Sequence, residues 1–591
     1  MSHIFSTTIE PTIQQLIEQF GKIDYQEHLI EAWVFGDKAH RQMAEATLLK
    51  QGVKAKLRSA YKPLLHFFME DIDLVTNQIS RIEVHYPLHP EASEKRFLLE
   101  TYPLSALLGN AQVYYIANTQ ATDFYNVILR SESGIQTQYK VFAPNNLHLD
   151  LIKQSHLSPT GWLKVTNPEG KVTHNERLLT DYETLFSLGM GAISEHSWKD
   201  TEPYFEELNI NVTLPWQDQP LPYKHEVLSL SEALHEDFYF SIQEWFKVKA
   251  GHNPNDREGQ PGQIVPEIHY RDDASLRITI ETRCYQTQNS QGKQILEFAN
   301  SPLSMVQVQT ELATISGALF NAKTVTGRTI NACYHQGADF PVMISGGQHA
   351  NETTGVIGTL RAAQLLQQKQ GSHFTISPLE NPDGYALHQR LISDNPHHMH
   401  HAARYTALGD DLEYRSTEPF YEKDIRYQAR AISQADLHIN LHGYPSHEWT
   451  RPLSGYVPRG FDMWTIPKGF FLILRHSEEE KWSQYAEDFI HLVTQKLIKI
   501  PGVMAFNKEQ IELYQLHAGE ANFRIINGFP CLISHGKPGD IPIQLITEYP
   551  DETLYGKHFI TGHNVQTETV LAAYEAHQVL SAHLTPYYLP Q

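Results

Sequence analysis

The 591-residue chain has few cysteines and no long hydrophobic segment. Its three cysteines, Cys284, Cys333 and Cys531, are too few and too scattered for a disulfide framework, which favours a reducing compartment and predicts a cytoplasmic protein. No run of about 18 or more apolar residues occurs, so the sequence predicts no membrane span. The first residues lack a basic stretch followed by an apolar one, which argues against a cleaved secretory signal.

Positive charge is also scarce relative to negative charge. The chain has 47 Lys and Arg against 68 Asp and Glu, a formal net charge of −21. Because nucleic acids are polyanions that bind through basic residues, we expect no nucleic-acid partner. The acidic residues are spread along the chain, so the net charge tells more about the solubility of the protein than about the substrate it binds. The length exceeds that of one ordinary hydrophobic core and predicts two or three domains.

The N-terminal portion carries no recognisable metal or nucleotide motif. Roughly the first 70 residues have helical periodicity, whereas residues 80–215 contain short alternating stretches typical of strands. A Pro-rich segment at 214–222 is the best candidate for a domain boundary. The regions predicted are an accessory α+β region at 1–220, a β-rich connecting region or front of the catalytic domain at 221–300, and a catalytic domain at 301–591.

Four motifs in the last half of the chain are placed next to predicted strands. GGQHANE (346–352) follows the apolar run from Val342 to Ile344 and precedes a stretch with helical periodicity. NPDGY (381–385), NLHGYP (440–445) and ITEYPDE (546–552) also follow or end apolar strand-like segments. In an open α/β sheet, functional groups gather at the carboxyl ends of the strands. The motifs therefore predict one common site.

Residues of these motifs could form a catalytic zinc site. Zinc takes His and carboxylate ligands in a tetrahedral arrangement, and a catalytic site leaves one position for water, whose pKa falls to about 7. His349 and Glu352 would supply two ligands from one loop, and a distant His the third. A further carboxylate must take the proton from the water, and Glu548 is the candidate, with Asp551 and Glu552 of the same motif as competitors.

The order and wording of these motifs resemble the zinc metallocarboxypeptidase superfamily, whose catalytic domain is a mixed sheet between two helical layers. The resemblance covers the chain from about residue 300 onward and implies an α/β fold with a mixed twisted sheet, preceded by the α+β region. His442 falls where the family has its third ligand, although His438, on the same side of the strand, is an alternative. Glu548 falls on the general base, and Arg390 on the carbonyl-polarising arginine.

The sequence departs from the digestive carboxypeptidases at the substrate-binding positions. Asn351 gives the wording His-Ala-Asn-Glu, closer to the desuccinylase and aspartoacylase branch of the superfamily. The Asn-Arg pair that grips a substrate carboxylate is missing from its expected place. Arg404 or Arg415 could hold a carboxylate instead, because a guanidinium binds one bidentately. The remaining candidates for substrate contact are Asn381, Tyr444 and the His-rich segment 395–401.

The resemblance implies a metallopeptidase that uses one zinc ion. The first prediction is a metallocarboxypeptidase that releases C-terminal residues from peptides. An alternative is a zinc amidase or deacylase acting on small acylated amino acids, cell-wall peptides or side-chain amides. A second alternative is a non-catalytic binding protein on a peptidase scaffold. The expected partner is a peptide or small amide substrate, whereas side-chain specificity, the role of residues 1–220 and the oligomeric state stay open.

Overall fold

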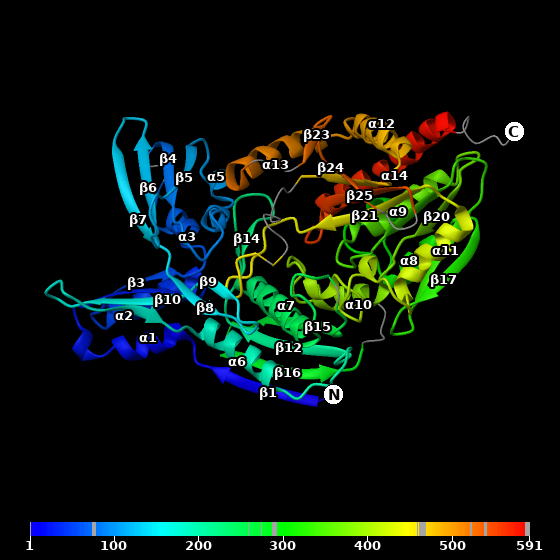
Figure 1. Cartoon of the computed structure of the whole chain (residues 1–591). Helices are drawn as coiled ribbons and strands as arrows, with labels where there is room; N and C mark the ends of the chain where they lie inside the picture. The colour runs from blue at the N-terminus through cyan, green and yellow to red at the C-terminus, as the bar shows by residue number, and fades with distance from the viewer. Residues whose placement is uncertain are drawn as a thin grey trace.

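The computed structural model describes residues 2–73, 78–257, 259–272, 275–285, 292–457, 459, 469–519, 523–536 and 541–584. The described part of the C-terminal half forms a nine-stranded mixed sheet in the order β17-β18-β20-β19-β21-β25-β22-β24-β23 (Figure 1). Its strands are β17 (Ala318–Lys323), β18 (Thr329–His335), β19 (Val342–Gly346), β20 (Phe374–Ser377), β21 (Leu437–Tyr444), β22 (Phe471–His476), β23 (Arg524–Ile526), β24 (Phe529–His535) and β25 (Ile543–Pro550).

Helices cover both faces of this sheet. On one face lie α8 (Met305–Leu312), α9 (Thr354–Leu366), α12 (Glu480–Leu497) and α14 (Gly556–Leu584), and on the other lies α11 (Asp424–Ser433). Strands β19, β21 and β25 are buried along their whole length, because helices exclude water from both of their faces. This is the predicted mixed sheet between helical layers, and the fold class is confirmed.

The centre of the sheet is parallel. Strands β20, β19, β21 and β25 are neighbours and run in the same direction. Their carboxyl ends therefore meet at one edge, where the predicted motifs lie. NPDGY forms the first turn of α10 (Pro382–Leu391), which follows β20. The Asn381 side chain caps this helix by accepting a hydrogen bond from Gly384 N at 2.9 Å.

The N-terminal half contains three four-stranded sheets among its described residues, in the orders β5-β4-β6-β7, β11-β10-β2-β3 and β1-β16-β12-β15. The first two sheets include β4 (Ile79–Tyr86), β5 (Gln112–Ala117), β6 (Phe124–Ser131), β7 (Gln136–Phe142), β10 (Gly161–Thr166) and β11 (Val172–Leu178). Helices α1 (Thr12–Phe20), α2 (Lys38–Lys50) and α3 (Pro63–Glu70) match the helical periodicity of this region. Strands β1 (Ser2–Ile9), β2 (Leu29–Val34) and β3 (Lys54–Ser59) lie between them. Expecting helices alone over these residues was wrong, because β2 pairs with β3 and with the distant strand β10, and β1 pairs with the distant strand β16.

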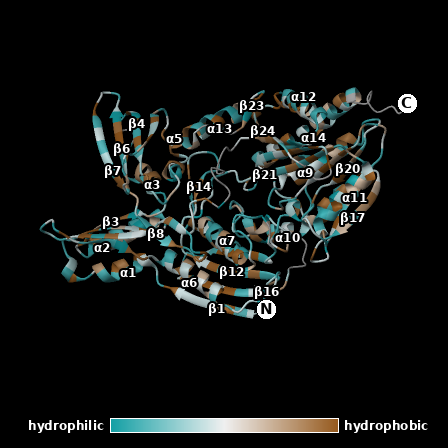
Figure 2. Cartoon of the chain, in the orientation of Figure 1, coloured by the Kyte–Doolittle hydropathy of each residue, from teal (hydrophilic) through white to brown (hydrophobic). Residues whose placement is uncertain are grey.

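The third of these sheets joins the two ends of the N-terminal half. Strand β1 pairs with β16 (Leu276–Arg283), and β12 (Glu207–Leu214) pairs with β15 (Gln263–Tyr270). A boundary at residue 220 would pass between strands of this one sheet. Along β12 and β16, hydrophobic and hydrophilic residues alternate in places (Figure 2), and the buried side packs against helices α6 (Asp181–Glu195) and α7 (Leu230–Lys249).

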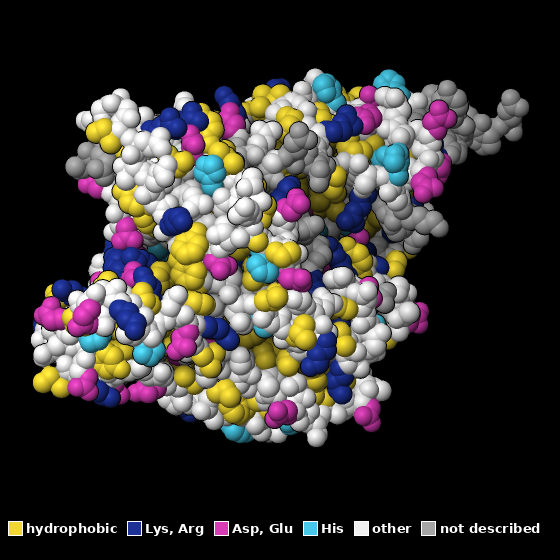
Figure 3. Space-filling view, turned by 60° about the vertical axis from the view of Figure 1, so that its left-hand side comes forward, with side chains coloured by type: hydrophobic (Ala, Val, Ile, Leu, Met, Phe, Trp, Pro, Cys, Tyr) yellow, Lys and Arg dark blue, Asp and Glu magenta, His cyan; other side chains and the backbone are white. Residues whose placement is uncertain are grey.

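The surface carries charges of both signs. On the face that Figure 3 shows, Lys and Arg side chains are interspersed with Asp and Glu side chains. Among the residues placed in the structure, no helix combines the length and the apolar character that crossing a membrane requires.

Candidate metal centre

Three predicted ligands meet at the carboxyl edge of the sheet. His349 and Glu352 lie in the turn between β19 and α9, and His442 lies near the end of the neighbouring strand β21. The turn depends on Gly347, whose φ of 62° is in the left-handed region that favours glycine. All three side chains are buried. Within the described residues, they are the one group of three whose ligand atoms come close enough to share a metal ion.

The distances between the ligand atoms fit a metal site. His349 Nδ1 lies 2.8 Å from Glu352 Oε1 and 3.1 Å from His442 Nδ1, and His442 Nδ1 lies 3.1 Å from Glu352 Oε2. Ligands about 2.0–2.1 Å from a tetrahedral zinc would be about 3.3 Å apart. Two imidazole nitrogens facing each other at this distance can share only one proton, whereas a metal ion would accept both lone pairs. The donor set therefore suits zinc.

A second layer of hydrogen bonds orients the ligands. His349 Nε2 lies 3.1 Å from a carboxylate oxygen of Asp411, and the backbone N–H of Gly443 donates to Glu352 Oε2 at 3.0 Å. Burial opposes ionisation of Asp411, but His349 outweighs it and lowers the pKa of Asp411. A carboxylate on the far nitrogen of a ligand His fixes its ring and its tautomer. Asp411 lies between the predicted residues Arg404 and Arg415, but no motif in the sequence singles it out.

Glu548 lies directly opposite His442 in the parallel pairing of β25 with β21. It is buried, and its Oε2 atom has no hydrogen-bond partner among the residues that the structure describes. Burial raises the pKa of Glu548 well above its ordinary value, and the nearby negative charge of Glu352 raises it further. The same causes, with Arg404 opposing them, raise the pKa of Glu552. This excess of buried carboxylates is what a divalent cation would offset.

An arginine does contact the cluster, but it is Arg404 and not Arg390. The Arg404 guanidinium donates to Glu352 Oε1 and lies 3.7 Å from Glu552. Arg390 instead donates to Glu207 at 2.9 and 3.1 Å and pairs with Glu267 at 2.9 Å. Because Arg390 lies in the last turn of α10, it reaches strands β12 and β15 of the N-terminal half. The structure therefore does not bring Arg390 to the three ligands.

Other residues predicted to contact the substrate donate hydrogen bonds to the protein itself. The Arg415 guanidinium donates through Nε and both terminal nitrogens to Asp410, Glu422, Thr406 and the Phe420 carbonyl. The Tyr444 hydroxyl donates to the Gly469 carbonyl. The Asn381 side chain, besides capping α10, donates to the Tyr405 carbonyl at 3.0 Å. In this structure Arg404 is therefore the predicted substrate-binding residue that contacts the ligand cluster.

The alternative histidines have other partners. His438 Nε2 lies 2.7 Å from Ser345 Oγ and is not one of the three clustered ligands. In the His-rich segment, His398 pairs with Asp218, and His401 Nδ1 lies 2.6 Å from a carboxylate oxygen of Glu236. These side chains are buried and connect the segment to the N-terminal half rather than lining an open wall.

Helix α7 supports the loops around the centre through a row of buried carboxylates. Glu236 pairs with His401, three residues before Arg404, and Glu232 lies 2.7 Å from His447 Nε2. Asp237 accepts hydrogen bonds from the backbone N–H groups of residues 453 and 454 at 3.0–3.1 Å. A buried carboxylate bound in this way fixes the loop that contacts it. Helix α7 thus helps to position the loops after α10 and β21.

Comparisons with known proteins found similarity to solved structures alone, and at low scores. No protein-family model matches the sequence, and no curated protein does. A metallo-carboxypeptidase from Pseudomonas aeruginosa is similar in structure at 14% identity and a TM-score of 0.30, over 53% of this chain and 73% of that one. For a metallo-carboxypeptidase from Burkholderia cenocepacia the values are 13%, 0.30, 54% and 74%.

A succinylglutamate desuccinylase/aspartoacylase from Rhodobacter sphaeroides is similar at 10% identity and a TM-score of 0.25, over 45% of this chain and 66% of that one. Scores this low carry no argument about activity, so the function must be inferred from the residues of the site.

Proposed function

We propose that the protein is a zinc-dependent hydrolase of amide bonds. The observation that carries this proposal is the position of Glu548, opposite His442 in register and beside the cluster of His349, Glu352 and His442, with one carboxylate oxygen unpartnered within the described structure. A metal-binding cluster alone would suit a structural site. A free buried carboxylate next to it suits general acid–base chemistry.

Each residue of the site has its own role in the proposed reaction. His349, Glu352 and His442 would hold a zinc ion, which would supply a Lewis acid that lowers the pKa of a water and polarises the substrate carbonyl. Glu548 takes the proton from the attacking water and then donates it to the departing amine. Its raised pKa suits both steps, because an acid–base catalyst works best with a pKa near the working pH. Arg404 is placed to donate hydrogen bonds to the oxyanion of the tetrahedral intermediate.

The finer proposal is a carboxypeptidase acting on peptides with a free C-terminus. It requires a cationic group that holds the substrate carboxylate; in this activity Arg404, the candidate beside the ligands, would take that role instead of the oxyanion. A second candidate is an amidase or deacylase, favoured by a specific observation. Arg415 and Tyr444 both donate hydrogen bonds to other groups of the protein, so they have few donors left for a substrate carboxylate.

A peptide library separates these activities. Purified protein is incubated with small N-acyl amino acids and with peptides that carry either a free or an amidated C-terminus. Each incubation is run with and without a zinc chelator, and the products are identified by mass spectrometry. Chelator-sensitive loss of C-terminal residues from the free-acid peptides alone supports the carboxypeptidase. Cleavage of small N-acyl amino acids, with both peptide sets intact, supports the deacylase.

The Glu548→Gln protein is the matched control for this library. It keeps the shape and the metal ligands and should cleave nothing at a comparable rate. Equal cleavage by the variant and the wild type would refute the assignment of the base. If the wild type binds zinc and hydrolyses no amide at all, the hydrolase proposal fails and a binding protein on this scaffold replaces it.

A further inference from the structure

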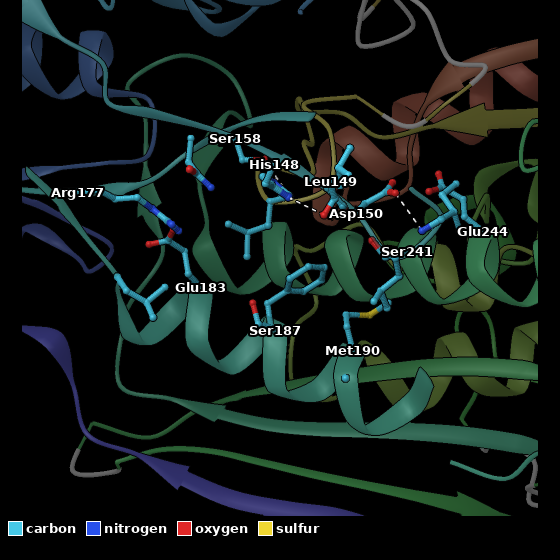
Figure 4. A pocket seen from close by; sticks show the side chains of 18 residues that line it. His148, Leu149, Asp150, Ser158, Arg177, Glu183, Ser187, Met190, Ser241 and Glu244 are labelled. Atoms are coloured by element: carbon cyan, nitrogen blue, oxygen red, sulfur yellow. Dashed lines mark hydrogen bonds and ion pairs between the residues drawn. The ribbon is translucent and has the colours of Figure 1, made fainter. Parts of the chain in front are cut away.

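A cavity separate from the metal centre lies in the N-terminal half. It occupies about 370 Å³ between α6, α7 and the hairpin of β8 (Asn145–Leu149) and β9 (Ser155–Pro159) (Figure 4). None of the metal-centre residues lines it. Pockets for small molecules typically measure about 300–1,000 Å³, whereas voids left by imperfect packing are rarely larger than a water molecule. The size of the cavity therefore fits a ligand better than a packing defect.

The walls of the cavity are mainly apolar. Phe186 and Met190 contribute from α6, and Leu453 from the loop after β21. Leu149 and Leu179, which also line it, are 65% and 58% exposed. Large apolar side chains gathered at an opening are a feature of binding sites, because leaving them in water costs free energy.

The acidic groups that line the cavity are already paired. Asp150 lies 3.0 Å from His156 Nε2, and Glu244 pairs with Arg451. Glu183 accepts hydrogen bonds from Thr180 and from Arg177. Arg459 also pairs with Asp150, and the ion pair of Glu183 with Arg177 leaves that end of the cavity without net charge, so a ligand is selected there by hydrogen bonding.

Arg177, in the lining, has one uncommitted nitrogen. Arg177 uses Nε for Thr160 and Nη2 for Glu183, both at 2.8 Å, and its Nη1 has no partner in the described part of the chain. The Arg177 side chain is 41% exposed, so this donor is accessible at the opening. Figure 4 shows Arg177 and Glu183 together at one end of the cavity and Met190 and Glu244 toward the other. An apolar ligand could thus place an oxygen acceptor against Arg177.

We propose that this cavity binds a small amphiphile, an aliphatic or aromatic body that ends in an oxygen acceptor such as a carboxylate. The apolar body contacts Phe186, Met190 and Leu453, and the acceptor receives a charge-assisted hydrogen bond from Arg177. The proposal does not depend on the metal centre or on any activity.

Isothermal titration of the full chain with octanoate tests the proposal, with octylamine as the matched probe of opposite charge. Octanoate should bind at one saturable site and octylamine much more weakly. Exchanging Arg177 for Gln should weaken octanoate about tenfold and affect octan-1-ol less, because the hydrogen bond from the guanidinium joins two ionised groups only when the acceptor is a carboxylate. The same titrations on zinc-free protein should give the same affinities.

A variant that fills the cavity locates the site. Gly191 lines the cavity on α6, and a Cβ atom built there meets no heavy atom within 4 Å. Gly191→Phe should therefore fold, since most residues other than proline favour a helix more than glycine does, and should abolish octanoate binding. Met43→Phe, at a 65% exposed position on α2, is the control and should bind normally.

Unchanged octanoate binding by Gly191→Phe would overturn the proposed location. Absence of saturable binding of octanoate and octan-1-ol at millimolar concentration would overturn the site itself. Equal affinities for octanoate and octylamine would overturn the role of Arg177.

Discussion

Replacing Glu548 with Gln tests the proposed chemistry most sharply among single substitutions. Gln has nearly the same shape and can occupy the same buried position opposite His442, but it cannot accept and return a proton. A positioned acid–base group contributes about 10²–10⁴-fold to rate, or about 2.7–5.4 kcal/mol of activation free energy. We expect kcat to fall by that factor while the zinc content stays that of the wild type.

Glu552→Gln is the matched control, because Glu552 is also buried in the same motif and has a raised pKa. Its carboxylate accepts a hydrogen bond from Asn351 at 2.7 Å, which a glutamine carbonyl oxygen can still accept. We expect kcat to change much less than in Glu548→Gln. The assay is the initial rate on the substrate identified by the library, normalised to bound zinc. Full activity of Glu548→Gln together with loss in Glu552→Gln would refute the reasoning and move the base to Glu552.

Three further predictions follow from the contacts around the centre. Asp411→Asn should weaken zinc binding about 10–100-fold in a competition titration with a chelator, whereas Asp394→Asn, which perturbs an exposed Asp–His pair elsewhere, should not; equal affinities would refute the role of Asp411. Arg404→Lys should lower kcat about 10²–10³-fold with a smaller change in KM; an unchanged kcat would remove Arg404 from the oxyanion. Burial raises the pKa of Asp237 to about 7. Since the folded chain then keeps a proton that the unfolded chain releases above about pH 4, this group makes the unfolding free energy fall as pH rises toward 7, by up to about 1.4 kcal/mol per pH unit. Urea melts of Asp237→Asn should lack that part of the slope, and identical pH profiles would contradict the shift.

The ligand loop could be predicted because its signals are local. An apolar strand, a Gly-Gly turn and a helical stretch surround His349 and Glu352, and the structure has β19, the turn and α9 at those places. His442 and Glu548 lie on strands that the apolar residues of 437–441 and 541–546 predict, and both strands are buried along their whole length. The order of the motifs along the chain then indicated that they share one edge of the sheet.

The partners of these residues could not be predicted in the same way. Asp411 is 62 residues from His349, and their contact forms only when the loop after α10 returns to the edge of the sheet. Arg390 was placed by its spacing from NPDGY, but that motif begins helix α10, whose last turn directs Arg390 to Glu207 and Glu267. Tertiary contacts of this kind leave no periodic signal in the sequence.

The sheets of the N-terminal half were also hard to predict, because their strands pair over long distances in the sequence. Strand β1 pairs with β16, more than two hundred residues later in the chain, so its role in a sheet is invisible in its own eight residues. The burial of the α7 carboxylates could not be predicted from the sequence either, because a helix with acidic residues normally suggests a solvated face. Their burial follows from the loops that they hold, including the turn before Arg404.

The most direct test of the central claim is the zinc content of three purified proteins, measured by mass spectrometry of the metal after dialysis. We predict one zinc per chain in the wild type and in His438→Ala, because His438 bonds Ser345 rather than the cluster. His442→Ala should lose zinc while keeping its circular dichroism spectrum. Retention of one zinc by a folded His442→Ala protein, or its absence from the wild type after refolding with zinc, would contradict the assignment of His349, Glu352 and His442 as the metal site.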